Sequence, residues 1–178
     1  MKALLLAAML FAPIVVQPQT QERTQDDGKP CELVDGGSHV LTPQMKATLA
    51  TRYRSYRVHQ QCVAENRDLD RDPTFSSVAS GDYDADGRVD QAVLLEPRTA
   101  AVRRIVVVFM TSAGGAAVLA GDGFSFVSTI NRGTLGHNWD TEQDFTYTTD
   151  AIFTGDFHCC GASFVWRNGK FYRFTSSD

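Results

Sequence analysis

The sequence is short of positive charge and has few prolines and glycines, and each shortage excludes a class of protein. Lys and Arg number 17 against 21 Asp and Glu, which gives a net charge of −4. Because the basic residues form no cluster, we expect no nucleic-acid partner and no attraction to anionic membrane surfaces. Six Pro and 14 Gly among 178 residues are too few for a collagen-like or low-complexity chain. This length is typical of a single domain that buries its own core.

The sequence also lacks an apolar run long enough to span a membrane. Residues 3–16 carry no charge, but these 14 residues fall short of the roughly 20 that a transmembrane helix needs. Lys2 before the run and a polar Gln/Thr/Glu stretch after it form the layout of a secretory signal peptide. A buried N-terminal helix is the alternative, which Pro13 disfavours. We therefore predict export.

Export divides the chain into three parts. We predict a signal peptide over residues 1–20, cleaved between Ala12 and Thr20, then a flexible polar leader over 21–30 and a single domain over 31–178. No Cys lies just after the apolar run, so we expect no lipid anchor. The mature protein should be periplasmic or secreted, without insertion into the membrane.

Cysteine is scarce, and its four copies suit that compartment. An oxidising space predicts disulfide bonds among Cys31, Cys62, Cys159 and Cys160, for which three pairings are possible. The adjacent pair Cys159 and Cys160 can close on each other only with an unusual backbone. Soft-metal or redox chemistry near His158 is the alternative, but the sequence has neither Cys-x-x-Cys nor zinc-ligand spacing. Structural disulfides are therefore the prediction.

Local patterns predict one short helix followed by strands. Thr42 and Pro43 suit a helix start, and the helix should end between residues 52 and 55 with Met45 and Leu49 on one face. Apolar or alternating segments predict strands at 56–60, 75–79, 91–95, 105–110, 116–119, 124–128, 151–154, 163–166 and 171–174. The Asn168-Gly169 pair predicts a tight hairpin. We expect an α+β fold, with the helix packed on a mainly antiparallel sheet of about seven or eight strands.

One segment has the ligand spacing of a calcium loop. Residues 81–95 read Gly-Asp-Tyr-Asp-Ala-Asp-Gly-Arg-Val-Asp-Gln-Ala-Val-Leu-Leu. Aspartates fall at loop positions 1, 3, 5 and 9, a glycine allows the sharp turn at position 6, and position 7 offers a backbone carbonyl. Hard oxygen donors without a neighbouring His or Cys favour Ca²⁺ over zinc or copper. The predicted ligands of Ca²⁺ are Asp82, Asp84, Asp86, Arg88 and Asp90.

This segment departs from an EF-hand, because Val93 replaces the bidentate Glu at position 12 and strands flank the loop. It resembles the calcium-binding FG-GAP or VCBS-type repeat, in which Gly-Asp-hydrophobic-x-x-Asp-Gly-x-x-Asp joins two strands. The matching residues are Gly81, Asp82, Tyr83, Asp86, Gly87 and Asp90. The resemblance implies a calcium site in one copy; it implies neither the propeller that several copies build nor their adhesive role. A metal-free Asp-rich turn is the alternative.

The surrounding sequence adds a second resemblance. The short helix before the loop and the closing Trp-x-x-Gly-Lys-Phe after it resemble small exported bacterial proteins. This resemblance implies no activity.

Two other groups are weaker candidates for function. Residues 133–144 hold His137, Asp140, Glu142 and Asp144, a set able to perform acid/base chemistry, although a solvated loop is the alternative. An aromatic and basic patch is a candidate partner surface, or packs in part on the sheet; it comprises Tyr53, Arg54, Tyr56 and Arg57.

These patterns leave two function classes. The first is a non-catalytic, exported, calcium-binding domain that recognises another protein, as an interaction module or an inhibitor or immunity-type protein. No catalytic residue is predicted for it. The alternative is a secreted hydrolase that uses the 133–144 segment, with calcium as a structural ion.

Overall fold

The computed structural model describes residues 33–62, 76–99, 103–112, 115–120, 124–156 and 160–177. The predicted signal peptide and leader, together with Cys31 and Cys159, lie outside these residues. Within them the chain is mostly β, with antiparallel sheets and one short α-helix. The antiparallel sheets and the single helix agree with the prediction. The chain is mostly β rather than α+β. The predicted sheet of seven or eight strands is wrong, because the described strands divide among separate, smaller sheets.

Four groups of strands make up this architecture. The five-stranded sheet contains β2 (Tyr56–Val58), β4 (Val78–Gly81), β5 (Asp90–Pro97), β6 (Ile105–Met110) and β7 (Gly115–Ala120). The four-stranded sheet contains β8 (Phe126–Ile130), β11 (Ala151–Gly155), β12 (Gly161–Arg167) and β13 (Lys170–Ser177). Two further pairs join β1 (Leu33–Asp35) to β3 (Gln60–Cys62) and β9 (Leu135–Asn138) to β10 (Gln143–Thr146). A 3₁₀ turn (Ser38–Val40) precedes α1 (Pro43–Arg52).

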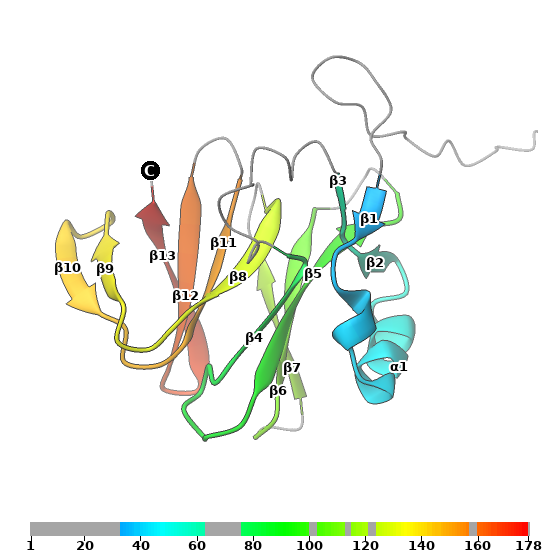
Figure 1. Cartoon of the computed structure of the whole chain (residues 1–178), viewed down its shortest axis with the longest axis horizontal. Helices are drawn as coiled ribbons and strands as arrows, with labels where there is room; N and C mark the ends of the chain where they lie inside the picture. Colours follow the sequence, from blue (N-terminus) through cyan, green and yellow to red (C-terminus); the bar gives the residue numbers. More distant parts are fainter. Residues whose placement is uncertain are drawn as a thin grey trace, which may run out of the picture.

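The elements stack in layers, which Figure 1 shows from left to right as the β9–β10 hairpin, the four-stranded sheet, the five-stranded sheet and α1. Both β2 and β4 pair with the same edge of β5, and β6 and β7 follow on its other side. An isolated antiparallel bridge between Ser76 and Val127 joins the two large sheets beside β4 and β8. This bridge precedes β4, and the β4–β5 loop follows the other end of the strand.

Strands β5 and β6 are apolar on both faces, because both faces are covered. Successive side chains of a strand point to opposite faces. Ala92 and Leu94 belong to the core between the two large sheets, whereas Val93 and Leu95 belong to the cluster beneath α1. All four side chains are almost fully buried. This two-sided burial explains why residues 92–95 form a continuous apolar run.

Helix α1 begins where the sequence predicts. The Oγ1 atom of Thr42 accepts a hydrogen bond from the backbone N–H of Met45 at 3.2 Å, and Pro43 occupies the first turn. Met45, Leu49 and Tyr53 pack on the outer face of the five-stranded sheet. The predicted helix start and apolar face are confirmed. No helix in the described part of the chain is long and apolar enough to cross a membrane.

Local sequence patterns predict one of two hairpins, β12–β13, but not the other, β9–β10. Asn168 and Gly169 both have positive φ, 50° and 79°, and connect β12 to β13 as the sequence predicts. The expectation that residues 133–144 form a loop is wrong, because they contain β9 and the start of β10. Most side chains of this second hairpin are at least partly exposed, so no alternation marks it. Phe145 anchors it by packing against Phe174 at a ring-centroid distance of 5.2 Å.

Both described cysteines take part in disulfide bonds. Cys62 lies at the end of β3 and Cys160 immediately before β12, and each is disulfide-bonded. No described cysteine is free. The three pairings weighed from the sequence involve Cys31 and Cys159, which lie outside the described residues.

Candidate metal centre in the β4–β5 loop

The Asp-rich loop is the connection of a β-hairpin. Gly81 at the end of β4 pairs with Asp90 at the start of β5, so residues 82–89 form the turn between them. Asp82, Asp84 and Asp86 each offer a carboxylate oxygen, and these three atoms lie within 4.8 Å of one another. The structure therefore brings together three of the predicted ligands.

The loop is curled by hydrogen bonds from its own backbone to these same aspartates. Asp82 Oδ2 accepts from the N–H of Gly87 at 3.1 Å, and Asp86 Oδ1 accepts from Arg88 N–H at 2.8 Å. Gly87 has φ +82°, a conformation that side chains other than glycine's rarely adopt. In each aspartate, one carboxylate oxygen therefore accepts a hydrogen bond that stabilises the curled loop. Oxygens that these bonds do not use are available for other donors or for a cation.

One of the remaining oxygens is buried without a partner. Asp82 Oδ1 is closed off from solvent and accepts no hydrogen bond in the described part of the chain. A buried polar atom without a partner is costly, and native structures rarely retain one without a ligand or water. In contrast, Asp84 Oδ2 accepts a hydrogen bond from the hydroxyl of Ser112. Ser112 lies outside the loop motif, and no spacing in the sequence indicated it.

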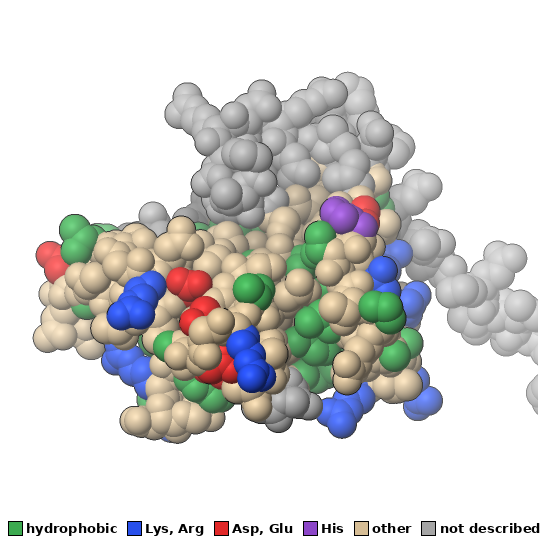
Figure 2. Space-filling model, turned by 60° about the horizontal axis from the view of Figure 1, so that its bottom comes forward, with side chains coloured by type: hydrophobic (Ala, Val, Ile, Leu, Met, Phe, Trp, Pro, Cys, Tyr) green, Lys and Arg blue, Asp and Glu red, His purple; other side chains and the backbone are tan. Residues whose placement is uncertain are grey.

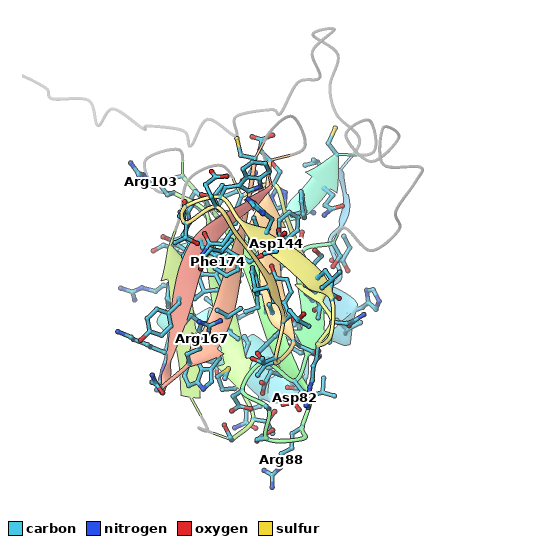
Figure 3. The ribbon with its side chains drawn as sticks, turned by 90° about the vertical axis from the view of Figure 1, so that its left-hand side faces the viewer. Asp82, Arg88, Arg103, Asp144, Arg167 and Phe174 are labelled. Carbon is cyan, nitrogen blue, oxygen red and sulfur yellow. The ribbon has the colours of Figure 1, made fainter. Side chains whose placement is uncertain are left out.

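Of the other two predicted ligands, Asp90 does not belong to this group of three, and Arg88 would contribute only its backbone carbonyl. Asp90 is fully buried; its Oδ1 accepts from the N–H of Thr111 at 2.7 Å and its Oδ2 from the N–H of Tyr83 at 3.2 Å. Burial raises the pKa of the Asp90 carboxyl above its usual value. Arg88 projects from the tip of the loop away from the sheets, at the same end as Asp82 (Figure 3). A backbone carbonyl ligand at Arg88 stays a prediction, as does ligation by Asp90.

The start of the loop is tied to the four-stranded sheet. Asp150, which precedes β11, accepts hydrogen bonds from the N–H groups of Asp82 and Arg132, each at 2.9 Å. The Tyr83 hydroxyl lies 2.9 Å from Thr129 Oγ1 on β8, and the Tyr83 ring belongs to the core between the sheets. These contacts hold the first aspartate of the loop against a second element of the fold. Preorganisation of this kind lowers the cost of collecting ligands around an ion.

The acid/base candidates lie on the β9–β10 hairpin and separate into two parts. His137 Nδ1 is 2.7 Å from Asp144 Oδ1, and its Nε2 is 3.6 Å from Glu142 Oε2. Asp140 instead accepts a hydrogen bond from the N–H of Thr175 on β13, which lowers the pKa of the Asp140 carboxyl. The structure therefore joins three of the four predicted residues.

His137 should titrate above the ordinary pKa of histidine. The hydrogen bond to Asp144 raises the His137 pKa, and Glu142 adds to the effect. A histidine pKa raised by folding stabilises the folded state fully below the unfolded pKa, and this contribution is lost as the pH rises through the folded value. Asp144→Asn should bring the His137 pKa, measured by NMR titration, back toward its ordinary value. An unchanged His137 pKa in Asp144→Asn would contradict the assignment.

The chemistry of the β4–β5 loop follows from its donor set. The three grouped side chains supply only hard carboxylate oxygens, which suit Ca²⁺, Mg²⁺ or Mn²⁺ and not the softer zinc or copper ions. Comparisons of the chain with protein-family models, with curated proteins and with solved structures give no match.

Proposed function

We propose that this chain is an exported, non-catalytic domain that binds Ca²⁺ through the β4–β5 loop and acts by recognising another protein, as an interaction module or an inhibitor or immunity-type protein. The observation that supports the metal site is the approach of Asp82, Asp84 and Asp86 to within 4.8 Å of one another. Like charges this close repel, and a divalent cation between them removes the repulsion. The buried, unpartnered Oδ1 of Asp82 supplies a ligand atom that needs such a partner.

Calcium is favoured over magnesium by the shape of the loop. Magnesium demands near-ideal octahedral geometry and keeps several waters, whereas calcium accepts irregular sets of carboxylate and carbonyl oxygens. Val93 occupies the position at which a full EF-hand has its bidentate Glu. The missing ligand places the expected dissociation constant in the weak, extracellular range of about 10⁻⁴–10⁻³ M. Such a site stays filled only where free calcium is high, which agrees with export.

Calorimetric titration tests this proposal. Chelator-treated protein should bind one Ca²⁺, with weaker binding of Mg²⁺. Asp82→Asn should abolish binding, because it removes the charge of a central ligand while its side-chain oxygen can still accept from Gly87. Asp140→Asn is the matched control: it removes one carboxylate from the β9–β10 hairpin and should leave binding unchanged. Absence of calcium binding by the unaltered protein would overturn the proposal.

A secreted hydrolase is the second candidate, and the His137–Asp144 hydrogen bond is what favours it. A carboxylate hydrogen-bonded to one ring nitrogen orients an imidazole whose other nitrogen can act as a general base. In the structure this other nitrogen, His137 Nε2, is closed off from solvent, so catalysis would require the Glu142 side chain beside it to move. If this candidate is right, a panel of chromogenic ester, peptide and glycoside substrates should reveal an activity that His137→Ala removes. If no substrate is turned over, the non-catalytic proposal is favoured.

A further inference from the structure

A second concave site lies between α1 and the β2 side of the five-stranded sheet, and it shares no residue with the β4–β5 loop. The cavity has a volume of about 490 Å³, within the range of about 300–1,000 Å³ that is typical of small-molecule sites. Its apolar lining includes Leu41, Leu49, Tyr53, Tyr56, Val58 and Leu95. Leu41 and Leu95 are buried beneath it, so the floor is part of the folded core.

The rim of this cavity is positively charged. Lys46, Arg54, Arg57 and Arg98 line it, and none of the described lining residues is acidic. The whole chain has a net charge of −4, so this local excess of cations does not follow from composition. Figure 2 shows hydrophobic side chains exposed beside Lys and Arg side chains on the right-hand part of the molecule.

Among the described residues, one of the four cations has a carboxylate partner. Arg57 Nε lies 2.6 Å from Glu96 Oε1. Arg98 Nε donates to the backbone carbonyl of Tyr56 at 3.1 Å, which anchors its guanidinium at the rim. No described carboxylate pairs with Arg98. Lys46 and Arg54 form no ion pair in the described part of the chain. Three cations therefore line the cavity without a compensating carboxylate from the described residues.

We propose that this cavity binds a small amphiphilic carboxylic acid, with its apolar chain on the floor and its carboxylate at the rim. Guanidinium groups bind carboxylates through two parallel hydrogen bonds, and Arg54 and Arg98 supply two such groups. Transfer of the apolar chain from water to the cavity floor adds a favourable hydrophobic free energy to binding. A hydrophilic anion has no apolar chain and lacks this contribution. A protein partner fits less well, because specific protein interfaces bury about 800 Å² of each partner, whereas this site is a pocket of ligand size.

Titration with dodecanoate below its micelle concentration tests the proposal on the full chain, with binding followed by calorimetry. Dodecanoate should bind at least about tenfold more tightly than dodecanol, which has the same chain without the charge. Arg54→Glu should weaken dodecanoate binding at least about tenfold, equivalent to about 1.4 kcal/mol. Arg167→Glu makes the same change of charge at the exposed end of β12, outside the pocket, and should leave binding unchanged.

Several outcomes overturn this assignment. Equal affinity for dodecanoate and dodecanol would mean that the rim charges play no part. An equal loss in Arg54→Glu and Arg167→Glu would mean that only the net charge of the protein matters. Failure of dodecanoate to bind, with tight binding of an acidic peptide that carries apolar side chains, would make the cavity a protein-recognition site instead.

Discussion

Calcium should raise the melting temperature of this protein above its value in chelator, and Asp86→Asn should remove the difference. An ion that binds the folded state and not the unfolded chain stabilises by about 2.7 kcal/mol at 100 times its dissociation constant. For a domain of this size that corresponds to a shift of roughly 5–11 °C. Differential scanning calorimetry in chelator and then in excess Ca²⁺ measures it. Asp140→Asn should retain the full shift.

In chelator, where no calcium is bound, Asp86→Asn should not lower the melting temperature. Asp86 is one of three carboxylates within 4.8 Å of one another, so Asp86→Asn removes a like charge from the group. Its Oδ1 atom accepts from the N–H of Arg88, and an asparagine oxygen can still do so. The metal-free variant should therefore melt at the same temperature as the metal-free unaltered protein, or higher. A lower temperature in chelator would mean that the carboxylate charge stabilises the loop without a metal. No calcium response in the unaltered protein would mean a metal-free turn.

Replacement of Tyr83 by alanine should have the largest effect of any substitution in the loop. The Tyr83 side chain is fully buried in the core between the two large sheets, although it lies between two candidate metal ligands in sequence. Truncation of a buried aromatic side chain costs about 3–5 kcal/mol, because it loses apolar burial and leaves a cavity. Urea denaturation of Tyr83→Ala should show this loss of unfolding free energy in chelator, where calcium contributes nothing.

Tyr83→Phe is the matched control for that experiment. It keeps the ring and removes only the hydroxyl that lies 2.9 Å from Thr129 Oγ1. Thr129 Oγ1 also donates to the carbonyl of Ser80, so it is not left without a partner. The expected cost is about 0.5–1.5 kcal/mol. Equal costs for Tyr83→Phe and Tyr83→Ala would show that the ring does not anchor the loop to the core.

Local features of this protein could be predicted from the sequence because neighbouring residues determine them. The start of α1 depends on Thr42 and Pro43, and the β12–β13 hairpin on Asn168 and Gly169. The group formed by Asp82, Asp84 and Asp86 is also determined by neighbouring residues. Its members come from alternate positions of one short loop, so their approach requires only that this loop curls.

The division of the strands into two large sheets could not be predicted. Residues 92–95 and 105–110 are apolar on both sides, and such runs do not reveal what covers each face. The structure covers one face with the four-stranded sheet and the other with α1. The β9–β10 hairpin was missed for the opposite reason, since its side chains are mostly polar or exposed and lack a period of two.

The environment of Asp90 and the composition of the cavity were decided by contacts between distant segments. The spacing predicts that Asp90 is a metal ligand. It does not predict that Thr111, which is 21 residues away, donates its backbone N–H to one oxygen of Asp90. The basic and aromatic residues at 53–57 were visible as a patch. Lys46 lines the same cavity as this patch because α1 packs on the five-stranded sheet. Arg98 lines it because β2 pairs with the end of β5. Sequence therefore determined the elements formed by neighbouring residues, whereas packing decided which distant side chains share a site, because only a folded chain brings them within reach.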